Sequence, residues 1–249
     1  MTGARTLVPL PLRHTVYYAR EAVRVRATRG RPSAADLVRW FRPWYRSLAP
    51  DASPLADEIP WLTFGAIRFL ERELPDGMRA FEYGTGGSTI FLARRAAELV
   101  TVEHDPVWAE LVRAAMAASA SSWHLHVVPP ESGEAGKSVT DPTDPDAFTS
   151  GDPASRARRF ETYARTIEPY ADASLDIVLV DGRARPSCLA LAVPKVRPGG
   201  VLVLDDSERE RYQRAIADPR LSSWERTDYS GPSPYQRPFA TSTVWRRPR

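Results

Sequence analysis

Four short apolar segments of this chain carry an acidic residue at or next to their ends, and this feature constrains the fold more than any other. They cover 79–83, 99–103, 175–181 and 201–205, and their acids are Glu82, Glu103, Asp181 and Asp205. Segments with the apolar periodicity of helices separate them, which is typical of parallel strands covered by helices on both faces. Because the carboxyl ends of parallel strands meet at one edge of a sheet, we expect the four acids to gather there.

The remaining elements complete an α/β architecture. Apolar residues at helical spacing predict helices over 14–28, 33–47, 61–73, 88–98, 106–118, 158–168, 186–196 and 207–217. Three further strands are predicted over 123–128, 223–229 and 241–246. The connection between the last two strands is rich in proline and indicates an antiparallel hairpin. The sequence therefore predicts a mostly parallel seven-stranded sheet with helices on both faces and an antiparallel C-terminal hairpin.

Residues 1–56 are interpreted as a basic, mostly helical N-terminal extension of a domain that covers 57–249. Residues 1–50 contain ten arginines against Glu21 and Asp36, which gives +8, whereas the whole chain carries +3. Such an arm is suited to an anionic membrane, a nucleic acid or an acidic substrate. We favour solvated helix faces, because no RNA-binding signature accompanies the arginines. The sequence therefore predicts no nucleic-acid binding, and it leaves membrane-surface contact and a homodimer as alternatives.

The stretch 129–157 is rich in Pro, Ser, Gly and Asp, and we expect no packed element in it. A connection of this length is either disordered or a mobile cover for a site. The composition leaves both interpretations open.

Several classes of protein are disfavoured by the composition. No segment approaches the run of about 18 apolar residues that a membrane-spanning helix needs. The N-terminus lacks the long apolar core of a secretory signal. Cys188 is the only cysteine, which excludes an intrachain disulfide and a Cys-rich zinc site. We therefore expect a cytoplasmic protein.

A glycine-rich turn, FEYGTGGST over 81–89, joins one of the apolar strands to the next helix. Glycines let the backbone approach a ligand closely, and the start of a helix presents unpaired N–H groups. Dinucleotide enzymes use a similar turn. Two acids distinguish this one, because Glu82 lies just before the first glycine and Glu103 ends the following strand, where a ribose would lie.

The motif E-x-G-x-G-x-S, followed by VTVEHD, resembles the nucleotide-binding half of class I S-adenosylmethionine (SAM)-dependent methyltransferases, and the resemblance covers about residues 57–249. It implies a Rossmann-like fold and SAM as the cofactor. In such a site Glu82 would hold the amino-acid end of SAM, and Gly84 and Gly86 would pass beneath the cofactor. Glu103 would bind both ribose hydroxyls.

Two neighbouring residues extend the cofactor site that the resemblance implies. Ser88 stands at the third small position of the motif, where its hydroxyl either caps the helix or contacts the cofactor carboxylate. His104 follows Glu103 directly and is interpreted as a wall of the adenosine pocket or as a solvent-facing residue.

The second half of the chain adds Asp181, Asp205 and Asp206 at strand ends, and these are the candidate catalytic residues. Asp181 is also assigned to the cofactor site. Close carboxylates raise each other's pKa, so we expect a cation among them, either the charged groups of SAM or a divalent ion. In the catechol O-methyltransferase-like branch, comparable acids hold Mg²⁺. This chain contains no Asn, so Asp206 would have to replace the amide of that metal site, and we do not favour Mg²⁺.

The resemblance implies methyl transfer to a small-molecule acceptor, and we expect a hydroxyl oxygen as the nucleophile. Arg183 and Arg185 either clamp an anionic substrate or pair with the neighbouring acids. Alternative functions are aminopropyl transfer on the same fold, nicotinamide-dependent oxidoreduction and non-catalytic nucleotide binding. The candidate general bases are Asp181, Asp205, Asp206 and His104.

Overall fold

The computed structural model describes residues 10–249 apart from 118, 120–121, 133–140 and 156–157. Its main sheet has seven strands in the order β3-β2-β1-β6-β7-β9-β8. The first five are parallel, and β9 and β8 are antiparallel to their neighbours, as predicted. In this order the strands are Ser122–Val127, Ala96–Glu103, Met78–Tyr83, Leu175–Val180, Val196–Leu204, Ala240–Arg246 and Glu225–Gly231.

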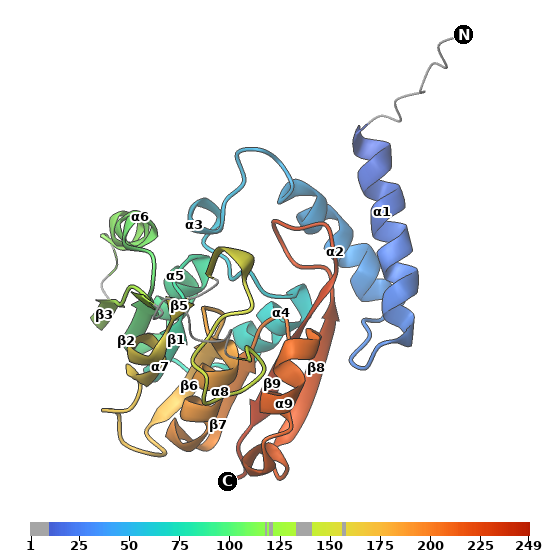
Figure 1. The fold of residues 1–249 in the computed structure, drawn as a ribbon. Helices are drawn as coiled ribbons and strands as arrows, with labels where there is room; N and C mark the ends of the chain where they lie inside the picture. The colour runs from blue at the N-terminus through green and yellow to red at the C-terminus, as the bar shows by residue number, and fades with distance from the viewer. Residues whose placement is uncertain (1–9, 118, 120–121, 133–140, 156–157) are drawn as a thin grey trace.

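Helices cover both faces of the sheet (Figure 1). One face packs against α4 (Phe64–Glu73), α5 (Gly87–Ala93) and α6 (Pro106–Met116). The other packs against α7 (Glu161–Arg165), α8 (Arg185–Ala192) and α9 (Gln213–Ile216). Successive residues of β1 alternate between these cores, with Ala80 in the first and Phe81 in the second, because side chains of a strand point to opposite faces.

Three predicted helices are shorter than expected because contacts with segments distant in sequence fix their starts or ends. Of the predicted helix 88–98, residues from Ala96 onward belong to β2 and pair with β1. Residues 158–159 of the predicted helix 158–168 form strand β5, which pairs with β4 (Glu131–Ser132). The carboxylate of Glu131 then accepts hydrogen bonds from the first backbone amides of α7, at 3.2 and 2.8 Å.

The predicted helix 207–217 begins late for a similar reason. The backbone amide of Ser207 donates to the carbonyl of Thr241 on β9 at 2.8 Å, so residue 207 is held to the sheet. A 3-10 turn, η4 (Glu210–Tyr212), and the short α9 take the place of the longer helix.

Parts of the stretch 129–157 are packed, which corrects the expectation of no packed element there. Phe148 is buried in the core beside α7, and its carbonyl accepts a hydrogen bond from the amide of Phe160 at 2.8 Å. Thr149 bridges to Arg159, and a 3-10 turn, η2, covers Pro153–Ser155. Residues 133–140 and 156–157 lie outside the described residues.

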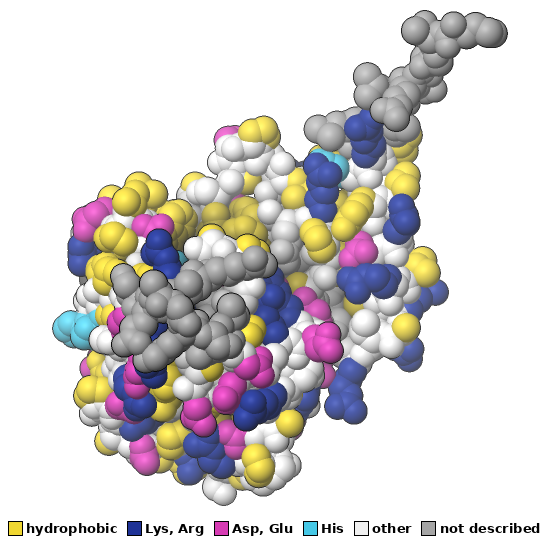
Figure 2. Space-filling view, viewed as in Figure 1, with side chains coloured by type: hydrophobic (Ala, Val, Ile, Leu, Met, Phe, Trp, Pro, Cys, Tyr) yellow, Lys and Arg dark blue, Asp and Glu magenta, His cyan; other side chains and the backbone are white. Residues whose placement is uncertain are grey.

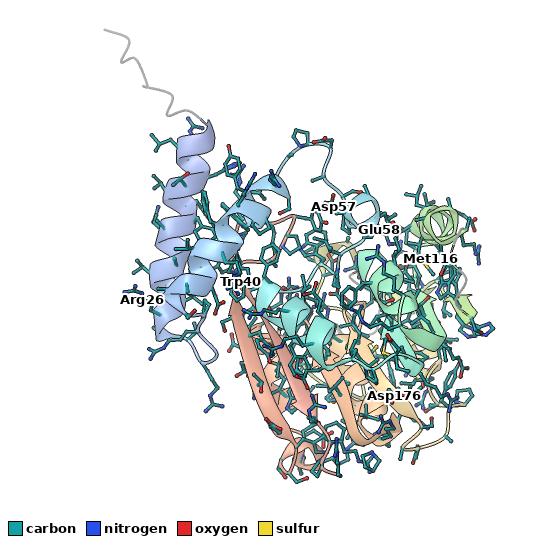
Figure 3. All side chains as sticks on the ribbon, turned by 180° about the vertical axis from the view of Figure 1, so that it is seen from behind. Arg26, Trp40, Asp57, Glu58, Met116 and Asp176 are labelled. Carbon is teal, nitrogen blue, oxygen red and sulfur yellow. The ribbon has the colours of Figure 1, made fainter. Side chains whose placement is uncertain are left out.

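The N-terminal helices lie beside the C-terminal hairpin (Figures 1 and 2). Helices α1 (Leu10–Arg24) and α2 (Ala34–Arg46), joined by the 3-10 turn η1 (Val25–Ala27), pack on the hairpin connection. Trp44 is fully buried there and donates from Nε1 to the carbonyl of Gln236 at 2.9 Å. Figure 3 shows Trp40 where α2 approaches the edge strand β8.

The turn after α1 protects the edge of the sheet. Gly30, at φ +71°, sits so close to β8 that a Cβ atom would lie 1.7 Å from the carbonyl oxygen of Asp228. Its own carbonyl accepts a hydrogen bond from the amide of Ser230 at 3.1 Å. This turn therefore shields part of an edge strand that would otherwise present unpaired backbone groups.

Residue 56, the predicted domain boundary, lies inside the short helix α3 (Pro54–Asp57). This segment packs against the start of α5, where a Cβ atom on Gly87 would lie 2.2 Å from the carbonyl oxygen of Ile59 and 2.3 Å from that of Pro54. Asp57 and Glu58 are seen beside α5 in Figure 3. No helix in the described part of the chain is both long and apolar enough to cross a bilayer.

Candidate active site

A cleft of about 370 Å³ opens at the carboxyl edge of the sheet, where the strand order reverses between β1 and β6. Such a reversal leaves a crevice in which open α/β sheets bind ligands, and the volume is that of a small-molecule site. It is lined by Trp61, Gly84, Thr85, Ser88, Glu103, His104, Asp105, Trp108, Asp181, Gly182 and Arg183.

The glycine-rich turn forms the floor of this cleft with two glycines that play different parts. Gly84 adopts φ +90°, and a Cβ atom on it would lie 3.2 Å from the backbone of Gly182, so β1 and β6 meet closely here. Gly86 has an extended backbone, and a Cβ atom there would meet only the Trp108 ring at 4.0 Å. A larger side chain at position 86 would therefore extend toward Trp108, which lines the cleft.

Glu103 lies against the glycine-rich turn, as the sequence predicts. Its carboxylate accepts hydrogen bonds from the amide and hydroxyl of Thr85, both at 3.1 Å. It also accepts from the amides of His104 and Asp105, at 2.7 and 2.9 Å. Burial raises the pKa of Glu103, but the hydrogen bonds from His104 and Asp105 outweigh it, so the pKa lies below its ordinary value. The carboxylate is therefore ionised and fixed in direction.

His104 connects Glu103 to the opposite wall of the cleft. Its Nδ1 lies 2.6 Å from the Glu103 carboxylate, and its Nε2 lies 3.1 Å from Nε of Arg183. Because an arginine nitrogen only donates, Nε2 accepts and the proton of the neutral ring lies on Nδ1. Arg183 continues the chain of contacts to Asp152, in the stretch 129–157. Arg183 thus pairs with an acid, one of the two interpretations that the sequence left open.

Glu82 is fully buried below the cleft, and one of its two carboxyl oxygens has a hydrogen-bond partner among the described residues. The hydroxyl of Thr89 donates to Oε2 at 2.6 Å and accepts from the amide of Gly86 at 3.0 Å. The other oxygen, Oε1, has no hydrogen-bond partner within the described residues. Burial is the main reason that the pKa of Glu82 rises to about 8, and the nearby hydroxyls of Ser88 and Thr89 oppose this rise. An unpaired buried carboxyl oxygen is costly, so it points to a cationic or donor group that completes the site on binding.

Asp181, Asp205 and Asp206 do meet, and the cation among them is the guanidinium of Arg185. Its NH2 donates to the carboxylate and carbonyl of Asp181, at 2.7 and 3.0 Å. Its NH1 donates to the carboxylate of Asp206 and the carbonyl of Asp205, at 3.1 and 2.7 Å. Nε donates to the carbonyl of Gly182 at 3.1 Å. All five N–H donors of the guanidinium are thereby used.

Arg185 corrects the expectation that SAM or a divalent ion would supply the cation at this place. Within the ranges that the structure describes, no group of three or more His, Cys, Asp or Glu residues is arranged to hold a metal ion. The guanidinium occupies the space between the three carboxylates that a metal would need. The residues present therefore do not fit the Mg²⁺ site of the catechol O-methyltransferase-like branch.

The three aspartates differ in their access to the cleft. Asp181 lines it, and burial, opposed by Arg185, raises the pKa of Asp181 to about 6. Asp205 is buried and accepts a hydrogen bond from the hydroxyl of Ser242 at 2.8 Å. Asp206, at φ +53°, forms ion pairs with Arg185 and Arg209. Neither Asp205 nor Asp206 is among the residues that line the cleft.

Sequence reasoning did not assign Thr85, Thr89 and Trp108 to the site. Trp108 donates from Nε1 to the carbonyl of Thr85 at 2.7 Å. A sequence signal for Trp108 exists, because Asp105 followed by Pro106 is typical of a helix start. Asp105 does cap α6, and the first turn of that helix carries Trp108 to the glycine-rich turn.

We predict that the buried guanidinium stabilises the fold much more than an exposed one with the same partner. Arg185→Met should lower the free energy of unfolding by about 3–5 kcal/mol, because it leaves buried carboxylates uncompensated. Arg209→Met is the matched control: Arg209 also pairs with Asp206, but its side chain is 40% exposed against 11% for Arg185. It should cost about 1 kcal/mol or less. Denaturant unfolding measures both, and equal costs would contradict the role given to Arg185.

No protein-family model matches this chain, and no curated protein matches it in sequence. A putative rRNA-methylase from Clostridium thermocellum is similar in structure, with a TM-score of 0.50 and 11% identity over 76% of this chain and 97% of that one. An O-methyltransferase from Bacillus cereus in complex with SAH has a TM-score of 0.49 and 17% identity over 94% of this chain and 99% of that one. The likeness to the rRNA-methylase shows that the chain has the Rossmann-like fold of this solved structure.

Proposed function

We propose that this chain is a SAM-dependent methyltransferase that transfers a methyl group to a hydroxyl oxygen of a small-molecule acceptor. Two acids carry the proposal: Glu103, which is ionised at the cleft, and Glu82, which is buried below it and has one oxygen without a hydrogen-bond partner among the described residues. The backbone of Gly84–Gly86 lies between these two acids. A nucleoside with a positively charged amino-acid end matches this distribution of charge. The fold of the methylase with a TM-score of 0.50 is consistent with it.

Four features of the cleft support SAM as the cofactor. The Glu103 carboxylate is oriented to accept hydrogen bonds from ribose hydroxyls, if the hydroxyl of Thr85 turns away from it. The open side of Gly86 leaves room for the ligand against the backbone. Ser88 lines the cleft and its hydroxyl interacts with Glu82, so it would contact the amino-acid end there. His104 forms one wall of the same cleft.

When bound, SAM would supply an electrophilic methyl group, so the protein has mainly to align the acceptor oxygen and exclude water. Asp181 is the proposed general base because it alone of the three candidate aspartates lines the cleft. Its pKa of about 6 lies close to neutral pH. At pH 7 most of this carboxylate is therefore unprotonated and is still basic enough to accept a proton. Arg185 would hold the Asp181 carboxylate in place. Asp205 and Asp206 would in turn hold Arg185, so we propose these two aspartates as positioning residues.

A small-molecule acceptor is favoured over RNA, although one structural neighbour is a putative rRNA-methylase. The cleft is bounded by Trp61 and by Arg183, whose pairing with Asp152 brings the stretch 141–155 to its rim. These walls suit an acceptor enclosed in the cleft. Aminopropyl transfer on the same fold remains the alternative reaction.

The experiment that tests the proposed cofactor is calorimetric titration with SAM, S-adenosylhomocysteine and NAD. The wild-type chain should bind the first two and not NAD. Gly86→Leu should abolish binding without unfolding the chain, because the leucine side chain would fill the cleft. Gly86→Ala is the graded control and should retain binding, since its methyl group would meet only Trp108. Unchanged SAM affinity in Gly86→Leu would refute this placement of the cofactor.

Asp181→Asn tests the proposed base once a panel of hydroxyl-bearing acceptors has yielded an active one. We expect kcat to fall by about 10²–10⁴, the usual contribution of a general base, and SAM affinity, to which Asp181 would contribute as a residue of the cofactor site, to fall by less than kcat. Asp205→Asn, at a position away from the cleft, should keep most of kcat. An equal loss in the two variants would mean that the aspartates act only by supporting the fold.

A further inference from the structure

Helix α1 carries one apolar row that the structure explains. His14, Tyr18 and, just after the helix, Val25 are buried and recur at helical spacing. The Tyr18 ring lies 4.8 Å from the Trp44 ring and 5.0 Å from the Phe239 ring, and its hydroxyl donates to the carbonyl of Leu37 at 2.7 Å. This row attaches α1 to α2 and the hairpin connection.

A second apolar row runs along the opposite side of α1 and is left uncovered by the residues that the structure describes. It consists of Leu12, Val16, Ala19 and Val23, spaced so that all four fall on one face, which we call the outer row. Leu12 is 52% exposed, Val16 50% and Val23 69%. Three of the seven large hydrophobic side chains that are exposed on the described chain are therefore gathered on this one helix.

Positive charge accompanies the outer row. Arg13 and Arg20 are exposed and, at 100° per residue, lie along one side of it. Arg26 follows in η1 and is seen in Figure 3 beside the C-terminal end of α1, on the side away from the sheet. In the view of Figure 2, Arg and hydrophobic side chains alternate along α1. The only acid of Leu10–Arg24 is Glu21, which is used by the amide of Phe239 and by Arg24.

The chemistry of the outer row favours one occupant. A second copy of α1 would bring arginines against arginines, with no exposed acid on the helix to compensate them. RNA would be met by aromatic side chains that stack on bases, whereas the outer row is aliphatic. An anionic lipid surface satisfies both features, because aliphatic side chains enter the acyl boundary while arginines contact the headgroups.

We propose that the outer row of α1 and its arginines form a docking surface for anionic lipid bilayers. The helix lies on the membrane surface with Leu12, Val16 and Val23 facing the acyl chains. The catalytic domain, on the other side of α2, stays in water. This surface is independent of the function proposed for the cleft.

The test is flotation of the full chain with vesicles of phosphatidylcholine alone or mixed with phosphatidylserine. The wild-type chain should float with the mixed vesicles and not with the neutral ones, and added salt should weaken binding. Val16→Ser combined with Val23→Ser should weaken it about tenfold, which corresponds to a loss of ~1.4 kcal/mol. Arg13→Gln combined with Arg20→Gln should weaken it comparably.

The matched control is Val107→Ser combined with Leu111→Ser. These residues form an exposed aliphatic pair on α6, at 74% and 52% exposure, beside the acid Glu110. This variant should float like the wild type. The proposal is overturned if the wild-type chain does not bind mixed vesicles, or if the α1 and α6 variants bind equally. It is also overturned if sedimentation shows a dimer that the Val16/Val23 variant converts to monomers, because the outer row would then be an interface between copies.

Discussion

Carboxylates that meet at the carboxyl edge of this sheet must each find a donor or a cation, and the arrangement of the edge follows from that requirement. Backbone amides and His104 compensate Glu103. The guanidinium of Arg185 pairs with the three aspartates and ties the ends of β6 and β7 together, and Arg209 pairs with Asp206 as well. Four of the five acids therefore pair with a basic side chain of the chain itself, although burial and the neighbouring Asp181 and Asp206 still hold the pKa of Asp205 well above its ordinary value. Glu82 is the exception, since one of its oxygens has no partner among the described residues.

The acids that are paired within the chain have a structural role, whereas the acid that lacks a partner for one oxygen is the one proposed to bind a ligand. Carboxylates that are paired with amides, His104 or Arg185 hold the carboxyl edge of the sheet rigid. A rigid edge preorganises a binding site before any ligand arrives. The half-compensated Glu82 keeps a raised pKa and leaves a place where a positive charge is favourable. Asp181 combines a structural role with a place in the cleft, because it is paired with Arg185 and also lines the cleft. A cationic nucleoside beside an acceptor alcohol would use both properties.

The sequence predicted the features that depend on local pattern, and it missed those that depend on contacts between distant segments. Apolar strands that end in acids were enough to predict the sheet and to bring Glu103 to the glycine-rich turn. Local pattern does not determine the position of Arg185, because an arginine side chain can turn toward a ligand or toward neighbouring acids. Helix 207–217 was overestimated because its start is tied to Thr241 on β9, which no local periodicity reveals. The partner of Arg183 was missed for the same reason, since Asp152 lies in a proline-rich stretch without a pattern.

The central claim is that the edge of the sheet binds a positively charged nucleoside, and the proton balance of SAM binding tests it most directly. The free chain should hold a proton on Glu82 below its pKa of about 8. A bound cation should lower that pKa, so that binding releases a proton and affinity rises with pH until it levels above about pH 8. Calorimetry in buffers of different ionisation enthalpy measures this release, and Glu82→Gln should abolish it. SAM binding without proton release in the wild-type chain, or no SAM binding at all, would contradict the account.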